Sequence, residues 1–476
     1  MADALRIAIA GLGTVGAGVI RLIETNSDMI AARAGRPIEI VAVSARERGK
    51  DRGVDLSPYA WVDDMQAMAQ RQDVDVVVEL VGGSDGPALT LARSAFDAGK
   101  GLVTANKAMV AHHGLELAEA AAIHNAPFAF EAAVAGGIPV LKGLREGTAA
   151  NALTRIYGIL NGTCNYVLSE MEQTGADFDE MLSAAQDKGY AEADPAFDIE
   201  GVDAAHKLAI LAAIGFGTTI DFPNVKTEGI TQVRASDIQQ ADTLGYVIRL
   251  VGIAALVGEG EDCRLLQRVR PCLVPFRHPL AAVTGPTNAV VAEGDFSGRL
   301  LFQGAGAGDK PTASAVVADL IDIARGQSGA PFSVPTTSLV QCAPADPGTR
   351  IGRDYIRFTV ADRPGVLAEI TAAMRDADVS IESLIQQGRD QDGGEVLVAM
   401  VTHEGPERCV AKALDLLDGS DSLTAAPLVL PMPPMKVLYP SRSRSFSGYS
   451  RTSSIGIDLE SPLNSNKLRK VARRSD

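Results

Sequence analysis

The chain opens with a buried-strand pattern that runs directly into a glycine loop. Residues 5–10 are mostly apolar, and Gly11-Leu12-Gly13-Thr14-Val15-Gly16 then leads into an apolar helix expected to end near Glu24. Gly11 permits a tight turn, Gly13 lets the backbone approach a pyrophosphate, and Gly16 lets helix and strand pack closely. Free N–H groups at the start of the helix then face the phosphates. This arrangement predicts a dinucleotide-binding α/β domain.

Further apolar strand patterns alternate with alanine-rich helices in the first part of the chain. The expected strands cover residues 38–43, 74–81, 101–104 and 128–131. The pattern at 74–81 is β-branched and apolar on both faces, as a buried parallel strand requires. The alternation predicts a doubly wound, Rossmann-like domain over residues 1–135.

Residues 136–303 mix helices and strands, and strands near 154–160 and 247–256 indicate a second, α+β domain. Residues 304–325 are glycine-rich and then helical, and are expected to return the chain to the first domain.

The C-terminal part divides into three segments. Residues 326–350 are rich in Ser, Pro, Gly and Thr and are predicted to form a linker. Residues 351–432 have a βαββαβ pattern, which predicts a ferredoxin-like unit. Residues 433–476 are rich in Ser and Arg and are predicted to be a disordered basic tail, either native or foreign to the protein.

Charge and cysteine content limit the partners of this chain. The formal net charge of −15 argues against nucleic acid or an anionic membrane as the main partner. The five cysteines are scattered and form no CxxC pair, so neither a disulfide framework nor a zinc site is indicated. The longest strongly apolar stretch, 208–214, is too short to span a bilayer. We expect a cytoplasmic protein.

The densest group of ionisable residues is the run 189–207, which places five carboxylates and a lysine within nineteen residues. Asp203 and Lys207 stand four apart at an expected helix start, so both project from one face. A lysine that leads into an apolar helix beside carboxylates can be desolvated and used to move a proton. A surface ion pair after an acidic loop is the alternative.

Two other segments offer candidate ligand-binding groups. Lys107 follows an expected strand at the carboxyl edge of the sheet, where ligands bind in open α/β folds, although a solvated lysine is the alternative. The run 131–137 combines one carboxylate with a series of backbone carbonyls, which are the oxygen ligands of a hard cation. An ordinary glycine turn is the alternative there.

The segment after the second strand bears on cofactor choice. It carries Arg46, Arg48 and Lys50 and no acid where a ribose 2′-hydroxyl would be bound. This favours a 2′-phosphate and therefore NADP, while a solvated basic loop is the alternative. Cys164 could serve as a thiolate nucleophile for an aldehyde, although a small buried cysteine is the commoner role.

Taken together, these motifs resemble those of homoserine dehydrogenases. The resemblance covers about the first 325 residues and rests on segments that occur in the same order and spacing, namely Gly11–Gly16, Glu79–Gly83, Thr104–Lys107, Asn161–Asn165, Gly189–Lys207 and Gly304–Ser314. Asp354–Asp362, followed by Arg-Pro-Gly-Val-Leu at 363–367, is similar to the ACT domain, a small-molecule regulatory module. The resemblance ends before the Ser/Arg-rich tail.

The resemblance implies reversible, NAD(P)-linked interconversion of L-aspartate 4-semialdehyde and L-homoserine on the pathway to threonine, methionine and isoleucine. Lys207 would be the general acid or base, and Lys107 would polarise the reacting oxygen. Glu192 and Asp203 would hold the substrate, and Asp198 would position the lysine. The residues implied in binding NADP or NAD are Gly11, Leu12, Gly13, Thr14, Val15, Gly16, Arg46, Thr104, Lys107, Gly189, Gly306 and Gly308.

The resemblance also implies a structural sodium ion held by Glu131 and backbone oxygens of Val134, Gly136 and Ile138. It implies that residues 136–303 serve catalysis and dimerisation, that the protein is a homodimer or homotetramer, and that threonine bound at the ACT unit inhibits it. Two other functions stay open on sequence grounds. One is a phosphorylating semialdehyde dehydrogenase acting through Cys164, and the other is a catalytically silent amino-acid sensor built on the ACT unit.

Overall fold

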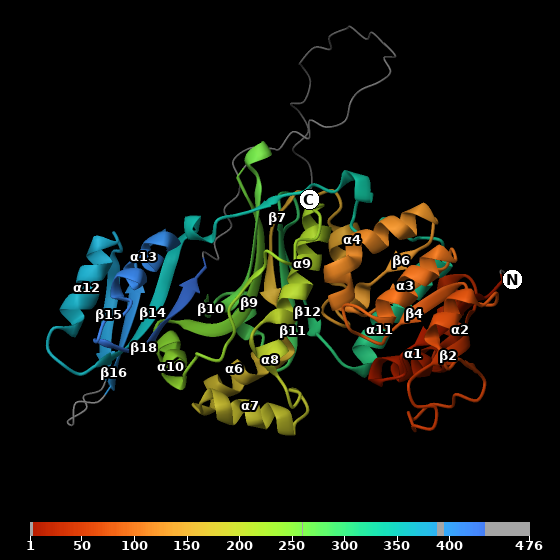
Figure 1. The fold of residues 1–476 in the computed structure, drawn as a ribbon, viewed down its shortest axis with the longest axis horizontal. Coiled ribbons are helices and arrows are strands. Elements are labelled where there is room, and N and C mark those ends of the chain that lie inside the picture. The colour runs from red at the N-terminus through yellow and green to blue at the C-terminus, as the bar shows by residue number, and fades with distance from the viewer. Residues whose placement is uncertain (1–2, 259, 388–394, 434–476) are drawn as a thin grey trace, which may run out of the picture. The chain divides into compact units, whose positions relative to one another are not determined.

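The first sheet of the computed structural model is parallel, with the strand order β3-β2-β1-β4-β5-β6 (Figure 1). The model describes residues 3–258, 260–387 and 395–433, so the predicted tail, apart from Pro433, lies outside the described residues. The strands are β1 (Leu5–Ala10), β2 (Ile38–Ser44), β3 (Ala60–Trp61), β4 (Val76–Glu79), β5 (Gly101–Thr104) and β6 (Phe128–Ala129). This order is that of a doubly wound nucleotide-binding sheet, so the predicted Rossmann-like fold is confirmed.

Helices cover this sheet. They are α1 (Thr14–Thr25), α2 (Ser27–Ala34), α3 (Pro87–Asp97), α4 (Lys107–Ile123) and α11 (Asp309–Ala324). The last of these comes from the segment expected to return the chain to the first domain, and it packs against α1. Arg21 pairs with Asp309 at 2.8 Å, and a Cβ atom on Gly18 would overlap the Asp309 carboxylate. Glycine at position 18 therefore allows the two helices to approach closely.

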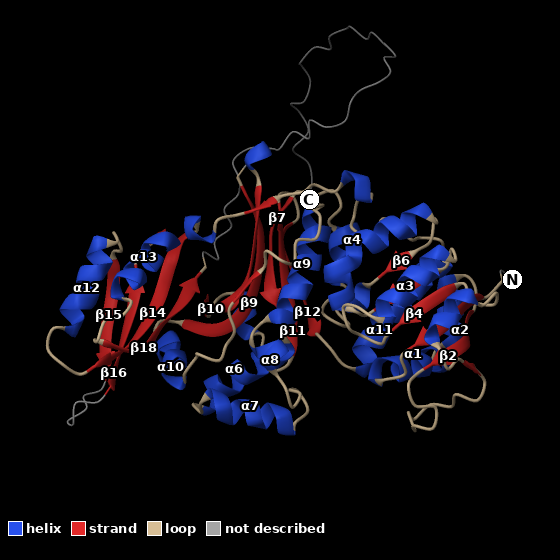
Figure 2. Ribbon diagram, in the orientation of Figure 1, coloured by secondary structure: helices blue, strands red, loops and turns tan. Residues whose placement is uncertain are grey.

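A mostly antiparallel second sheet follows, in the order β12-β11-β7-β9-β10-β13, with β8 also paired to β10 (Figure 2). Its strands are β7 (Leu153–Ile159), β8 (Lys226–Thr227), β9 (Tyr246–Val257), β10 (Arg264–Pro275), β11 (Thr287–Gly294), β12 (Gly298–Ala305) and β13 (Ala343–Pro344). Its helices are α5 (Val140–Lys142), α6 (Gly162–Thr174), α7 (Phe178–Asp187), α8 (Ala196–Ile199), α9 (Val202–Phe216) and α10 (Ala235–Thr243). Helix α9 packs on β7, β9 and β10 and is buried from Asp203 to Ile214.

The C-terminal unit has the predicted ferredoxin-like order. Its elements are β14 (Ile351–Ala361), α12 (Val366–Asp376), β15 (Ile381–Gln387), β16 (Glu395–Thr402), the short β17 (Gly405–Pro406), α13 (Glu407–Leu417) and β18 (Leu423–Met432). Strand β14 is central, and an apolar core lies between the sheet and the two helices.

Residues 326–350 differ from the expected linker, because they pack against the first two domains. Phe332 is buried, with its ring centroid 5.4 Å from that of Phe130. The Ser333 hydroxyl donates to the Ile214 carbonyl at 2.8 Å, and β13 pairs with β10. The segment is rich in small and turn-forming residues, which predicted a linker, but its one buried phenylalanine, Phe332, fixes it to the domains. None of the helices in the described ranges is long and apolar enough to cross a membrane.

Candidate active site

The carboxyl edge of the first sheet and the N-terminal end of α9 border a cavity of about 830 Å³. Of the residues predicted from the sequence, the cavity is lined by Val15, Lys107, Gly136, Gly189, Glu192, Asp198, Asp203, Lys207, Gly306 and Gly308. The fold therefore gathers into one place segments that are up to three hundred residues apart in the chain.

Asp203 lies at the centre of this cavity and bridges two lysines. Its Oδ2 atom accepts from Lys207 Nζ at 2.7 Å, and its Oδ1 atom lies 3.0 Å from Lys107 Nζ. The side chains of Asp203, Lys207 and Lys107 are 5%, 10% and 33% exposed. Burial acts to raise the pKa of Asp203, but the charges of Lys207 and Lys107 outweigh it and hold that pKa well below its ordinary range. Asp203 is therefore a fixed anion that places both lysines.

Lys207 keeps one donor for a ligand. Its Nζ atom donates to Asp203 and to the Leu160 carbonyl, the latter at 2.8 Å. Because an ammonium group has three N–H bonds, one remains on the side chain that lines the cavity. The predicted pairing of positions 203 and 207 on one helical face is present in the structure.

A second carboxylate lies beside this centre and is tied to it by Asn161. The Asn161 amide nitrogen donates to Asp198 Oδ1 and to Asp203 Oδ2, each at 2.8 Å. Burial and the nearby charge of Asp203 raise the pKa of Asp198. Thr163 Oγ1 lies 3.1 Å from Asp198 Oδ2. The sequence motif contained Asn161 and Thr163, but their function as a clamp depends on contacts across the chain. Glu192 is exposed at the cavity.

The glycine loop has the geometry that its sequence predicted. A Cβ atom on Gly11 would lie 2.4 Å from the Leu80 carbonyl oxygen, and one on Gly16 would lie 2.1 Å from that of Gly11. By contrast, no atom lies within 4 Å of a Cβ atom placed on Gly13. Gly13 caps α1 without a side-chain hydrogen bond, so the first N–H groups of the helix, starting at Thr14, stay available to an anion.

Thr104 has a supporting position behind the cavity. Its buried hydroxyl donates to Glu79 Oε2 at 2.5 Å and accepts from the Asn106 backbone N–H at 2.9 Å. These bonds hold the turn that leads into Lys107. Thr104 thus orients the lysine-bearing loop through the backbone.

An aromatic wall that the sequence did not reveal lies behind Lys107, along a neighbouring cavity of about 560 Å³. His206 stacks on Phe222 with ring centroids 4.2 Å apart, and its Nε2 atom lies 3.3 Å from His112 Nε2. Lys107 Nζ lies 5.8 Å from the ring centroid of Phe197, within reach of a cation–π contact. Burial lowers the pKa of His206 to about 4.

This shift makes stability depend on pH. Between about pH 4 and the ordinary histidine value of 6.5, the unfolded chain binds a proton at His206 that the folded protein does not. The free energy of unfolding should therefore rise with pH through this window, by on the order of 2 kcal/mol from this residue. We expect His206→Phe, which preserves the stack, to reduce the rise in urea titrations at several pH values. The exposed His403→Phe is the control, and an unchanged slope for His206→Phe would contradict this prediction.

The expected sodium site gains no support from the Glu131 carboxylate. Its two oxygens accept the backbone N–H groups of Leu141 and Lys142, each at 2.9 Å, so the carboxylate caps α5. Burial and the nearby Asp319 raise the pKa of Glu131 to about 7. Among the described residues, no group of three or more His, Cys, Asp or Glu side chains could hold a metal ion. A sodium ion at Val134, Gly136 and Ile138 would be bound by backbone oxygens without the Glu131 carboxylate.

Cys164 is unsuited to act as a nucleophile. It is fully buried, and burial raises the pKa of its thiol well above the ordinary value. Its Sγ atom lies 3.2 Å from the Asp198 carbonyl oxygen, where it packs α6 against α8. A thiol in this state has little of the thiolate form that attacks an aldehyde.

Family comparisons agree with the geometry. The family model for homoserine dehydrogenase matches residues 139–321, that for the homoserine dehydrogenase NAD-binding domain matches 11–131, and that for the ACT domain matches 355–415. The homoserine dehydrogenase of Pseudomonas aeruginosa is 41% identical over 426 residues, which cover 88% of this chain and 96% of the relative. That of Neisseria gonorrhoeae is 43% identical over 425 residues, or 88% and 96% of the two chains. The solved homoserine dehydrogenase of Thiobacillus denitrificans has a TM-score of 0.83 and 39% identity, and the match covers 90% of this chain and 98% of that one.

Proposed function

Because the chain belongs to the homoserine dehydrogenase family of oxidoreductases, we propose that the two-lysine cavity binds L-homoserine or L-aspartate 4-semialdehyde and that Lys207 exchanges the proton. The main support for this proposal is that the buried Asp203 pairs with both Lys107 and Lys207 where the glycine-loop domain meets α9. A bound nicotinamide cofactor supplies or removes the hydride in this family's reaction.

Proton transfer follows from the position of Lys207. Reduction of the aldehyde leaves a developing alkoxide, which Lys207 neutralises by giving up its free Nζ proton, and homoserine oxidation reverses this transfer. Lys107 pairs with the other carboxylate oxygen of Asp203 and polarises the reacting oxygen of the substrate. Asp198 and Glu192, which also line the cavity, hold the ammonium group of the substrate. Asp198 here takes the substrate-holding role expected of Asp203, because the Asp203 carboxylate already pairs with both lysines.

The decisive experiment is steady-state oxidation of L-homoserine by the full chain with NADP and with NAD. We expect turnover without phosphate, and Cys164→Ala should retain it. Phosphate-dependent oxidation of L-aspartate 4-semialdehyde that disappears with Cys164→Ala, without turnover of homoserine, would instead indicate the phosphorylating dehydrogenase. No turnover of either compound with either cofactor would leave the amino-acid sensor as the function.

We also propose that the cofactor is NADP. Arg46 and Arg48 are exposed just after β2, at the position of the adenosine ribose in this fold. Arg52, which the sequence argument did not single out, donates from Nε to the Leu12 carbonyl at 3.1 Å and to the Lys50 carbonyl from Nη1 at 2.6 Å. It therefore ties the basic segment to the glycine loop.

Replacing Arg46 with alanine should raise the KM for NADP by about tenfold and change the KM for NAD much less, because only NADP carries the 2′-phosphate dianion. Initial rates with each cofactor at saturating homoserine measure this difference. Arg33→Ala, at the end of α2, is the control for loss of one positive charge on the same domain. Equal effects of Arg46→Ala on both cofactors would remove the basis for assigning Arg46 to the phosphate.

Threonine is the proposed effector of the ACT unit. Gly365, with φ of +100°, precedes α12 and caps it without a side-chain hydrogen bond, so backbone N–H groups can meet a carboxylate there. A homodimer or homotetramer and a cytoplasmic location remain predictions.

Calorimetry should show heat of threonine binding, and millimolar threonine should inhibit the full chain. Gly365→Ala should weaken both effects because alanine is strained at this φ. Gly405→Ala is the control, since a Cβ atom there meets no atom within 4 Å and its φ is ordinary. Absence of heat together with unchanged kinetics would mean that the unit only supports assembly.

A further inference from the structure

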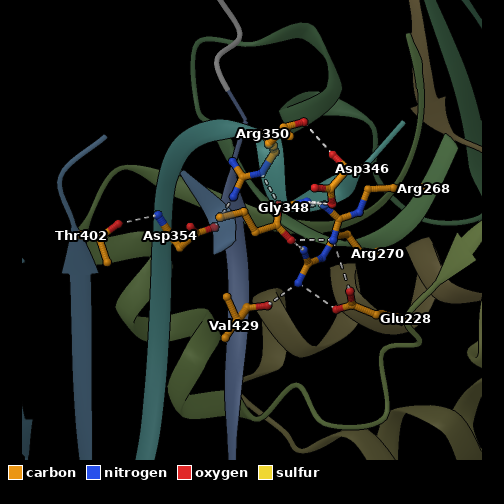
Figure 3. A network of polar contacts seen from close by, with 11 residues as sticks. Glu228, Arg268, Arg270, Asp346, Gly348, Arg350, Asp354, Thr402 and Val429 are labelled. Carbon is orange, nitrogen blue, oxygen red and sulfur yellow. Dashed lines mark hydrogen bonds and ion pairs between the residues drawn. The ribbon is translucent and has the colours of Figure 1, made fainter. Parts of the chain in front are cut away.

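The C-terminal unit meets two arginines of β10, Arg268 and Arg270 (Figure 3), which bind one of its carboxylates, and Arg270 also donates to the Val429 carbonyl at 3.2 Å. Glu407, the first residue of α13, accepts two bonds of 2.7 Å from the Arg268 guanidinium and one of 3.1 Å from Arg270 Nη1. Arg350 Nε adds a third partner at 2.7 Å. Burial opposes ionisation of Glu407, but hydrogen bonds from Arg268 and Arg350 lower its pKa to about 2. The carboxylate is therefore charged, and α13 is anchored to β10.

The same two β10 arginines hold a second carboxylate that belongs to the catalytic part of the chain. Arg270 Nη2 lies 2.8 Å from Glu228 Oε2, and Arg268 Nη2 lies 3.7 Å from Glu228 Oε1 (Figure 3). The Glu228 backbone N–H also donates to the Val269 carbonyl at 2.8 Å. A change in the position of Glu407 therefore alters the charges that hold Glu228.

Two residues beyond Glu228, the chain contacts the turn that carries the active-site acids. The Ile230 N–H donates to the Ile199 carbonyl at 2.9 Å, and a Cβ atom on Gly229 would lie 2.4 Å from that same oxygen. Ile199 ends α8 and follows Asp198 directly. Gly201, the N-cap of α9, packs on Val269 of β10, since a Cβ atom there would lie 3.1 Å from the Val269 side chain.

We propose that Arg268 and Arg270 are positioning residues shared by the C-terminal unit and the active site, and that Glu407 adjusts the placement of Asp198 through Glu228 and residues 229–230. The inference rests on the proposed role of Asp198 in binding substrate. It predicts that the C-terminal unit controls the affinity for homoserine, because residues 228–230 contact the α8–α9 turn. An amino-acid effector that moves α13 acts by the same route.

The test compares Glu407→Gln with Glu404→Gln in the full chain. Glu404 is exposed on the same connection, three residues earlier, and its variant should match the parent. We expect Glu407→Gln to raise the KM for homoserine by about fivefold or more, while kcat and the KM for NADP change less than about twofold. Glu228→Gln, at a side chain that is 48% exposed, should reproduce this split without unfolding the protein.

The double variant distinguishes a shared route from two independent effects. If both carboxylates act through the same arginines, Glu228→Gln combined with Glu407→Gln should raise the KM hardly more than either change alone. An unchanged KM for homoserine in both single variants would overturn the proposal. The Glu407 contact would then only attach the C-terminal unit to β10, even if the thermal midpoint of Glu407→Gln fell. If Glu407→Gln failed to fold, Glu228→Gln would decide alone. A parent chain without homoserine turnover would instead contradict the proposed function.

Discussion

Replacing Lys207 with alanine is expected to lower the rate of hydride transfer from homoserine by at least about 100-fold, the scale of a lost general acid or base. The affinity for NADP should barely change, because Lys207 lies on α9 and the glycine loop is on another domain. Single-turnover absorbance at the nicotinamide band measures the first quantity, and fluorescence titration with NADPH measures the second. Lys412→Ala, which removes an exposed lysine of α13, is the matched control.

Arginine at position 207 separates charge from proton transfer. It preserves a cation beside Asp203, but its guanidinium does not release a proton near neutral pH. Lys207→Arg should therefore be nearly as slow as Lys207→Ala. A Lys207→Ala protein that loses NADP binding and keeps its kcat would show that Lys207 is a cofactor ligand and that its assignment to proton transfer is wrong.

A chain that ends at Ser328 is expected to fail to fold stably. If residues 326–350 were the flexible linker expected from the sequence, the truncated chain would instead be an active enzyme that threonine does not inhibit. Truncation removes Phe332, and loss of a buried phenylalanine costs about 3–5 kcal/mol. It also removes Tyr355 and Arg357, which bind Asp237 of α10. The loss at Phe332 alone is a large fraction of the stability of a typical domain.

Expression yield in the soluble fraction and the thermal unfolding midpoint would measure this outcome. A chain that ends at Ala345 is the comparison, because it keeps Phe332, the contact of Ser333 with Ile214 and the pairing of β13. It should be more soluble than the shorter chain, although it also lacks Arg357. A Ser328-terminated protein with the midpoint and turnover of the full chain would show that residues 329–350 contribute nothing to the fold.

Buried charges make the contacts between the C-terminal unit and the catalytic domain. Asp237 of α10 accepts from Tyr355 and Arg357 of β14, and Glu407 of α13 binds β10. The C-terminal unit is thus held to one helix and one strand of the catalytic domain, α10 and β10. Such contacts are sensitive to small displacements, because a buried charge that loses its partner is strongly destabilised.

Local features of the chain were readable from the sequence because their physical causes are local. The glycine loop lies between β1 and α1 as its turn geometry requires, and the parallel strands were identified from their uninterrupted apolar runs. Asp203 and Lys207 share a helical face because four residues make about one turn. Family resemblance extended this reading to the reaction.

Tertiary structure alone decided the contacts between distant segments. Arg268 meets Glu407 across 139 positions, and the Glu131 N–H meets Asp319 across 188. The pairing of β11 and β12, the packing of residues 326–350 and the clamp formed by Asn161 likewise depend on which surfaces meet when the domains pack together. Residue type and spacing determine the conformation of short segments, whereas partner choice depends on the free energy of burying whole surfaces together. For this reason the sequence by itself determined the candidate lysines, and only the fold joined both to Asp203 and connected their site to the C-terminal unit.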